Sequence, residues 1–210
     1  DEKMNRIKNI IFDLGGVLLD LDVDRCMDRL EEVGLREVRQ WMTGTNEKGF
    51  FKKYECGTLT TDQFRDRICK EVGRELPGEE IDQIWNAMLK DIPDYKFELL
   101  LKLQENYKLY LLSNTNDLHW EHCADKFVYK GMQMLGCFTR VFLSYQMHLA
   151  KPDAEIFRTV LKEAGIKAEE TLFVDDSKDN CQAASLLGIK VFHYVPGDNL
   201  EIQLQNFISK

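Results

Sequence analysis

Residues 10–20, IIFDLGGVLLD, decide the fold, because a short apolar run delivers one carboxylate, Asp13, directly into a Gly-Gly turn. An apolar run of this length that ends at glycine is typical of a fully buried strand. In open parallel sheets, ligands bind just beyond the carboxyl ends of the strands. Asp13 therefore occupies a place where a catalytic residue is expected.

Two later stretches repeat this pattern of a buried strand followed by polar residues. One apolar run leads into Ser113 and Asn114, and another leads into Asp175 and Asp176. The carboxyl ends of neighbouring parallel strands meet at one edge of a sheet. We therefore expect all these side chains to converge with Asp13 on one crevice.

The remaining patterns predict an α/β fold, a Rossmann-like parallel sheet with crossover helices. Apolar runs alternate with amphipathic stretches in the manner of βαβ units. The expected strands are Ile7–Phe12, Tyr107–Leu112, Arg140–Leu143, Thr171–Val174 and Lys190–Val195. The expected helices are Tyr95–Glu105, Asp117–Val128, Ala154–Ala164 and Lys178–Leu187. The segment Tyr129–Thr139 fits neither pattern and is expected to be irregular.

A helical bundle is expected between the first strand and the rest of the sheet. Residues 20–92 carry almost only helical periodicity, including a capping box at Thr60 and Gln63 and a glycine stop at Gly73. The core domain would then comprise residues 1–19 and 93–210, and the bundle residues 20–92. We expect most of its aromatic residues to pack on one another: Trp41, Phe50, Phe51, Tyr54 and Trp85.

Composition excludes several classes of partner. The chain has 210 residues and a formal net charge of −8, which disfavours binding to nucleic acid and to anionic membranes. No apolar run approaches the ~20 residues that span a bilayer, and the N-terminal stretch has no apolar signal-peptide core, so we expect a cytoplasmic protein. The six cysteines form no C-x-x-C pair, which predicts reduced thiols mostly in the core. Monomer and homodimer both stay open.

The residue types at the strand ends suit phosphoryl transfer. A carboxylate can attack phosphorus only where the negative charges are neutralised, usually by a divalent cation and a lysine. Asp13 can bind a hard cation and attack, and Asp176 can supply the second carboxylate that Mg²⁺ prefers. Lys151, at the start of a helix, brings a positive charge, while Ser113 and the backbone N–H of Asn114 are donors for phosphoryl oxygens. We therefore predict Mg²⁺ as cofactor and a small phosphorylated metabolite as substrate.

The order of these motifs resembles that of the haloacid dehalogenase-like (HAD) hydrolases over almost the whole chain. The motifs are Asp13-Leu-Gly-Gly-Val, Ser113-Asn114, Lys151-Pro152 and Asp175-Asp176. The expected bundle matches the helical cap of that family. The segments LLSNTNDLH, KPDAEIF and FVDDSKDN look like the α-glucose-1-phosphate phosphatase branch. The resemblance implies hydrolysis of a sugar phosphate such as glucose 1-phosphate through an aspartyl-phosphate.

The resemblance also implies a role for each site residue. Asp13 would be nucleophile and metal ligand, and the main-chain carbonyl of Gly15 and the carboxylate of Asp176 would complete the metal site. Asp175 and Asn180 would orient these groups from behind. The residues expected to hold the phosphate are Ser113, Asn114 and Lys151.

One position departs from the pattern of the family. Most phosphatases of the superfamily have a second aspartate two residues after the nucleophile, which acts as general acid and base, but this chain has Gly15 there. Such acid–base help is worth about 10²–10⁴-fold. No spacing argument selects a substitute among Asp20, Asp22, His119 and His122. The loop at residues 55–58 is expected to be the part of the cap that reaches the site.

Two other functional classes stay open from the sequence. Gly15 makes a non-catalytic phospho-ligand binder or regulator plausible, and measured turnover would separate that from a phosphatase. A 2-haloacid dehalogenase uses the same nucleophile on carbon without a metal. Asp175 and Asp176 argue against it, because adjacent carboxylates beside a third repel one another without a cation. His119 and His122 have no third ligand nearby and are expected to be packing or surface residues rather than a zinc site.

Overall fold

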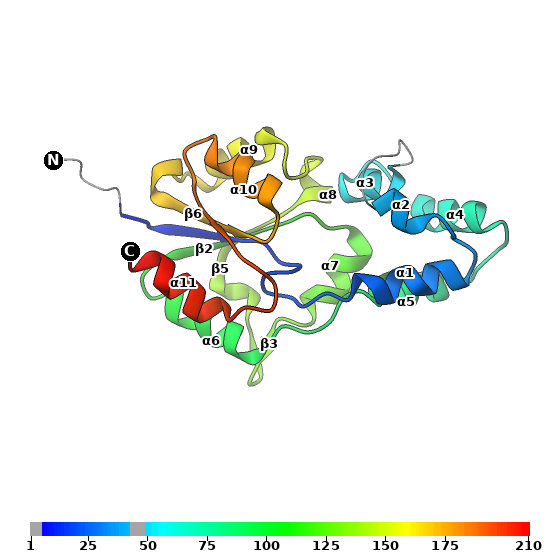
Figure 1. Cartoon of the computed structure of the whole chain (residues 1–210), viewed down its shortest axis with the longest axis horizontal. Helices are drawn as coiled ribbons and strands as arrows, with labels where there is room; N and C mark the ends of the chain where they lie inside the picture. The colour runs from blue at the N-terminus through cyan, green and yellow to red at the C-terminus, as the bar shows by residue number, and fades with distance from the viewer. Residues whose placement is uncertain (1–5, 43–48) are drawn as a thin grey trace.

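The computed structural model describes residues 6–42 and 49–210, which form an α/β core and a helical lobe (Figure 1). The core is built on a parallel sheet of five strands in the order β5-β2-β1-β6-β7. These strands are β1 (Asn9–Phe12), β2 (Lys108–Ser113), β5 (Phe138–Leu143), β6 (Thr171–Asp175) and β7 (Lys190–His193). The predicted α/β fold with a helical insertion after the first strand is confirmed.

The register of the central strands brings the predicted site residues together. Phe12 of β1 pairs with Leu111 of β2 and Val174 of β6. One residue further along, Asp13 is level with Asp175. Three strand ends therefore meet at the carboxyl edge of the sheet, as expected for a ligand site in an open parallel sheet.

Helices cover both faces of the sheet (Figure 1). On one face lie α6 (Asp94–Leu103), α7 (Asp117–Ala124) and α11 (Leu200–Ile208), and on the other lie α8 (Ser144–Met147), α9 (Ala154–Ala164) and α10 (Lys178–Ser185). Alternate residues of β1 serve the two layers: Phe12 belongs to the cluster with α6 and α11, and Ile11 to the cluster with α9 and α10. Both side chains are fully buried.

The helical lobe has a core of its own. Its helices are α1 (Val23–Glu32), α2 (Val38–Met42), α3 (Phe50–Glu55), α4 (Thr61–Val72) and α5 (Gly78–Asn86). The capping box of Thr60 and Gln63 starts α4, and Gly73 ends it with a left-handed φ of 81°. All five aromatic residues singled out from the sequence pack in the core of the lobe. The lobe therefore holds its shape by burying its own apolar surface.

The structure differs from the predicted elements in short segments. The stretch expected to be irregular holds an antiparallel hairpin of β3 (Val128–Tyr129) and β4 (Met132–Gln133), whose strands are too short to show an alternating pattern. Helix α7 ends at Ala124, before Phe127 turns into the core. Helix α11 was not predicted, and two 3₁₀ turns lie at Leu135–Cys137 and Ala168–Glu170.

Two chain-wide features bear on the expected class of protein. Across residues 6–42 and 49–210, every helix falls short of the length and apolar character that a membrane crossing requires. The six cysteines are free thiols, of which Cys26, Cys123 and Cys181 are buried.

Candidate active site

Asp13 lies at the carboxyl edge of the sheet, where β1 gives way to the Gly-Gly turn. Only 8% of its surface is exposed. Its main-chain N–H donates to the carbonyl of Val174 at 3.0 Å. Its Oδ1 accepts from the N–H of Leu14 at 2.8 Å and from Nζ of Lys151 at 2.9 Å. These contacts fix the carboxylate in one orientation.

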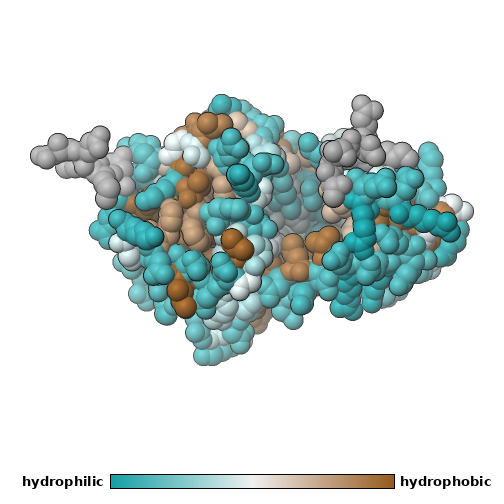
Figure 2. Space-filling model, in the orientation of Figure 1, coloured by the Kyte–Doolittle hydropathy of each residue, from teal (hydrophilic) through white to brown (hydrophobic). Residues whose placement is uncertain are grey.

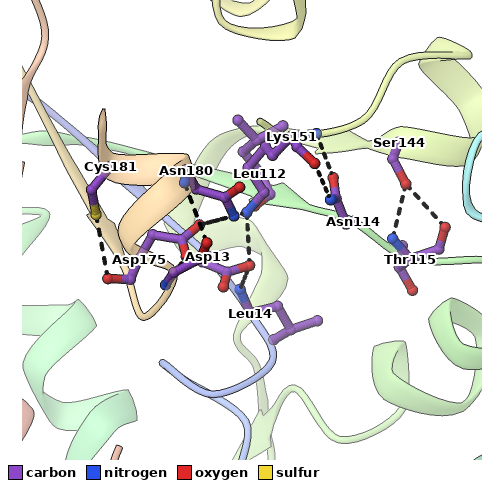
Figure 3. A network of polar contacts seen from close by, with 11 residues as sticks. Asp13, Leu14, Leu112, Asn114, Thr115, Ser144, Lys151, Asp175, Asn180 and Cys181 are labelled. Atoms are coloured by element: carbon purple, nitrogen blue, oxygen red, sulfur yellow. Dashed lines mark hydrogen bonds and ion pairs between the residues drawn. The ribbon is translucent and has the colours of Figure 1, made fainter. Parts of the chain in front are cut away.

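Lys151 is the positive charge of the site (Figure 3). Besides Asp13, its Nζ donates to Oδ2 of Asp175 at 2.8 Å and to the carbonyl of Leu112 at 3.0 Å. Its side chain is 1% exposed. Burial alone would lower the pKa of this lysine, but the carboxylates of Asp13 and Asp175 raise it above its ordinary value. Lys151 is therefore an ammonium ion held between two carboxylates.

Asp175 and Asp176 differ in their surroundings. Asp175 is fully buried, and its carboxylate accepts from Lys151, from the N–H of Ser177 at 2.8 Å and from Nδ2 of Asn180 at 3.1 Å. Both of its oxygens thus already have donors, which suits a residue that orients Lys151 and Asn180 (Figure 3). Asp176 is half-buried.

The carboxylates of Asp13, Asp175 and Asp176 offer oxygen atoms within 4.8 Å of one another. Burial raises the pKa of Asp13 to about 7; Lys151 opposes this rise, while the charges of Asp175 and Asp176 add to it. A hard cation beside these oxygens would remove the repulsion and favour the ionised forms. The donor set therefore fits a divalent cation such as Mg²⁺.

Gly16 permits a close approach between the turn and this cluster. Its φ is +84°, and a Cβ at this position would lie 2.4 Å from Oδ2 of Asp176. Glycine is therefore required both by the left-handed backbone and by the space that the carboxylate occupies. The metal-binding role predicted for the carbonyl of Gly15 stays a prediction.

Ser113 is the last residue of β2, and Asn114 comes directly after it. Ser113 is buried and lines the pocket beside Asp13. The side-chain amide of Asn114 exchanges two hydrogen bonds of 2.9 Å with the main chain of Lys151. Asn114 thereby holds the lysine segment against β2, and its predicted contact with phosphate through the backbone N–H stays a prediction.

A pocket of about 260 Å³ opens above Asp13, between the core and the helical lobe. Its polar wall comes mainly from the core: Asp13, Ser113, Asn114, Thr115, Lys151 and Asn180. Its apolar wall includes residues of the lobe and the segment leading into it: Leu21, Val23, Met42, Trp85, Met88 and Leu89. Figure 2 shows apolar side chains gathered where the lobe meets the core. The phosphate group of a bound ester would thus contact the polar wall, and its carbon chain would contact the apolar wall.

Two further residues, one in the pocket wall and one beneath the turn after Asp13, owe their position to tertiary packing. Glu55, at the end of α3, lines the pocket from the lobe, and it is the residue of the segment 55–58 that forms part of the pocket wall. Lys96 of α6 lies beneath the turn, and its Nζ donates to the carbonyl of Val17 at 2.6 Å. Lys96 was missed, although a lysine on the buried side of an amphipathic helix was a signal.

The other candidate acid–base residues do not suit that role. His119 lines the pocket, but its Nε2 lies 2.9 Å from the carbonyl of Trp85, and burial lowers its pKa to about 4. Its ring stacks on Trp85 at a centroid distance of 4.5 Å. Asp20, Asp22 and His122 are absent from the described wall of the pocket. His119 is therefore a packing residue, as expected.

Known proteins are similar to this chain over most of their length. Residues 7–188 match the family model of the haloacid dehalogenase-like hydrolases. A D-ribitol-5-phosphate phosphatase from Bacteroides thetaiotaomicron is 35% identical over 188 residues, which cover 89% of this chain and 91% of that protein. A sesquiterpene phosphatase from Aspergillus oryzae is 26% identical over 199 residues, covering 89% of each chain.

A solved structure agrees with the same assignment. A HAD family enzyme from Bacteroides thetaiotaomicron, crystallised as the wild-type protein with magnesium and inorganic phosphate, superposes with a TM-score of 0.86 at 42% identity. The match covers 92% of this chain and 96% of that one. With the family model, the relatives and the strand-end motifs in agreement, this chain belongs to the haloacid dehalogenase-like hydrolases.

Proposed function

We propose that this protein is a Mg²⁺-dependent phosphatase that hydrolyses a small phosphorylated metabolite. The observation that carries the proposal is the contact of Asp13 with Lys151 at the base of the pocket, beside Asp175 and Asp176. This arrangement provides a nucleophilic carboxylate with a fixed positive charge and a set of oxygen ligands for a cation. The complex of the related Bacteroides enzyme with magnesium and phosphate supports it.

The chemistry follows from the position of each residue. A carboxylate oxygen of Asp13 attacks phosphorus, and the bond from phosphorus to the alcohol oxygen breaks, which leaves an aspartyl-phosphate. Water then hydrolyses this acyl phosphate to inorganic phosphate and restores Asp13. Lys151, Ser113 and the backbone N–H of Asn114 hold the phosphoryl oxygens. Mg²⁺, held by Asp13, Asp176 and the carbonyl of Gly15, would neutralise the charge that nucleophile and phosphate share.

Within this class we propose a sugar or polyol phosphate as the substrate. The related D-ribitol-5-phosphate phosphatase supports a pentitol phosphate. Glucose 1-phosphate, the substrate suggested by the sequence motifs, is the alternative of the same class. The carboxyl group of Glu55 and the polar end of the pocket can receive substrate hydroxyls.

The apolar wall of the pocket favours a second candidate, a terpenoid alcohol phosphate. Leu21, Val23 and Met42 are each more than a third exposed at or near the pocket. An exposed apolar wall gains free energy by covering a hydrocarbon chain, at about 25 cal/mol per Å² buried. The sesquiterpene phosphatase relative supports this candidate.

The first experiment measures hydrolysis of p-nitrophenyl phosphate with Mg²⁺ and with EDTA. We expect metal-dependent turnover by the wild type and its loss in Asp13→Asn, which removes the nucleophile. Asp66→Asn, an exposed substitution on the lobe, is the matched control and should turn over like the wild type. A folded wild-type protein without turnover on any phosphate ester would instead support a phospho-ligand binder.

A substrate panel then separates the two candidates. D-ribitol 5-phosphate, glucose 1-phosphate and farnesyl phosphate differ in their alcohol but share the phosphoryl group. We expect the highest kcat/KM for the polyol phosphate. A preference for farnesyl phosphate would assign the apolar wall to a terpenoid chain, and Leu21→Ser should then reduce it.

A further inference from the structure

Glu55 faces the site from the side of the pocket opposite the core. It is the last residue of α3 and lines the pocket together with Asp13 and Lys151. Among the residues that the structure describes, Asp13 and Glu55 are the ones that bring carboxyl groups to this wall. Asp13 is engaged by Lys151 and is needed as the nucleophile. Glu55 is therefore the remaining carboxyl group of the described pocket wall.

The main chain around Glu55 is fixed to the core. Oγ of Ser144 donates to the carbonyl of Glu55 at 2.6 Å. The same oxygen accepts from the N–H of Thr115, just beyond Ser113, at 2.9 Å (Figure 3). Nδ1 of His148 lies 3.1 Å from the carbonyl of Cys56. Glu55 thus keeps a set position relative to the phosphate end of the pocket.

Gly57 allows the lobe to pack this closely against the core. Its φ is +70°, and a Cβ there would lie 2.1 Å from the carbonyl oxygen of Tyr145. Only glycine lets the chain after Glu55 turn so tightly against α8. The approach of Glu55 to the site is therefore built into the backbone.

The surroundings of Glu55 favour a carboxyl group that can hold a proton near neutral pH. Burial raises its pKa to about 7, against the opposing charges of Lys151 and Lys52. The other titratable groups nearby are Cys56 on the same segment, and Asp13 and His119 across the pocket. A general acid–base group works best when its pKa lies near the working pH.

We propose that Glu55 is the general acid and base of the reaction, supplied by the lobe because Gly15 has no side chain to do so. The role rests on the proposed phosphatase function. When Asp13 attacks, the bond from phosphorus to the leaving oxygen breaks, and that oxygen takes the proton of the Glu55 carboxyl group. The Glu55 carboxylate then takes a proton from the water that attacks the aspartyl-phosphate. Hydrolysis thereby returns both carboxyl groups to their starting states.

The test varies the basicity of the leaving group while its shape stays nearly constant. Para-substituted phenyl phosphates, from p-nitro to p-methoxy, carry no sugar hydroxyls, so lost hydroxyl contacts would not distinguish among them. Proton donation matters little for p-nitrophenolate and much for a basic leaving group. We expect Glu55→Gln to steepen the dependence of kcat/KM on leaving-group basicity. The loss should grow along the series toward the 10²–10⁴-fold typical of general acid catalysis for alkyl phosphates.

Three results would overturn the role. Equal losses across the series would show that Glu55 acts only in folding or binding, and no loss would show that it takes no part. Wild-type protein that hydrolyses neither this series nor D-ribitol 5-phosphate, glucose 1-phosphate and farnesyl phosphate would overturn the phosphatase itself, and the role of Glu55 with it. Glu75→Gln, an exposed substitution on the same lobe, should keep the wild-type dependence.

Discussion

At Gly16, the backbone conformation and a neighbouring carboxylate both disfavour any residue with a side chain. The left-handed φ of +84° strains any other residue, and the carboxylate of Asp176 fills the space where a Cβ would lie. Alanine there must displace Asp176, the half-buried carboxylate of the cluster. Position 16 therefore controls the shape of the cation site, although it contributes no side chain to it.

We predict that Gly16→Ala weakens the apparent affinity for Mg²⁺ at least tenfold and reduces kcat. A Mg²⁺ titration of activity and isothermal calorimetry measure the two effects. Gly131→Ala is the matched control, because Gly131 has φ +75° and, among the described residues, nothing lies within 4 Å of the place that its Cβ would take. It shares the strain, roughly 1–3 kcal/mol, without the collision. Equal Mg²⁺ affinities in both variants would mean that the collision with Asp176 does not control the cation site.

Lys96 stabilises the turn from below. Its side chain is 4% exposed, its Nζ donates to the carbonyl of Val17, and Asp20 lies 3.7 Å away. Burial lowers its pKa, and Asp20 opposes that shift. The ammonium group thus closes the loop that follows Asp13.

Lys96→Met should leave the carbonyl of Val17 without this donor. We expect a loss of about 1–3 kcal/mol in the free energy of unfolding and a lower kcat, because the loop also carries Gly15 and Gly16. Urea unfolding and steady-state kinetics measure these effects. Lys102→Met, on the exposed side of the same helix, is the control. A stable Lys96→Met protein with wild-type kcat would rule out any positioning by Lys96.

Helix α7 joins the two parts of the molecule at the level of whole elements. Trp85 of α5 stacks on His119 of α7, and its Nε1 donates to Oδ1 of Asn116 at 3.2 Å. The hydroxyl of Tyr54 accepts from the N–H of Leu118, whose side chain packs into the core of the lobe. One crossover helix of the sheet therefore also serves as the platform for the lobe.

The neutral state of His119 gives this junction a pH dependence. The folded pKa of about 4 lies below the ordinary value of 6.5. Below pH 6.5 His119 therefore takes up a proton in the unfolded chain before it does so in the folded protein. The contribution of neutral His119 to the free energy of unfolding is complete above pH 6.5 and falls as the pH drops toward 4. We expect a loss of roughly 2–3 kcal/mol from this group by pH 4.5.

Urea unfolding of the wild type and of His119→Gln from pH 7 to 4.5 measures this dependence. The variant should be less stable at pH 7 and should lose less stability on acidification. His122→Gln, one turn later and exposed, should retain most of the wild-type slope. An unchanged slope in His119→Gln would place the acid sensitivity in other groups.

Some helices and strands could be predicted from the sequence and others could not. The buried strands and helix α9 carry strong periodic patterns, because each buries one face or both. The strand ends also predicted that Asp13 would lie beside Asp175 and Asp176. The two-residue strands β3 and β4 carry no such period, and the contacts of Glu55 and Lys96 depend on how distant segments pack. Those features required the three-dimensional structure.

At the scale of the whole molecule, folding concentrates negative charge in an already acidic protein. The net charge is −8, and three carboxylates of the site face one lysine, Lys151. Unfolding separates Asp13 from Asp175 and Asp176 by more than 160 residues of chain. A cation that needs these oxygens together binds the folded state alone, and its binding free energy adds to stability.

Mg²⁺ should therefore raise the melting temperature of the wild type, by an amount that saturates with one site per chain. At a Mg²⁺ concentration 100 times its Kd the gain is about 2.7 kcal/mol, which corresponds to roughly 5–10 °C for a chain of this length. Asp176→Asn should lose most of this gain, whereas Asp66→Asn should keep it. Equal increases in melting temperature for all three proteins would place the cation on the acidic surface instead, because diffuse binding does not depend on the carboxylate of Asp176. Differential scanning calorimetry over a Mg²⁺ series, with EDTA reversal, distinguishes these outcomes.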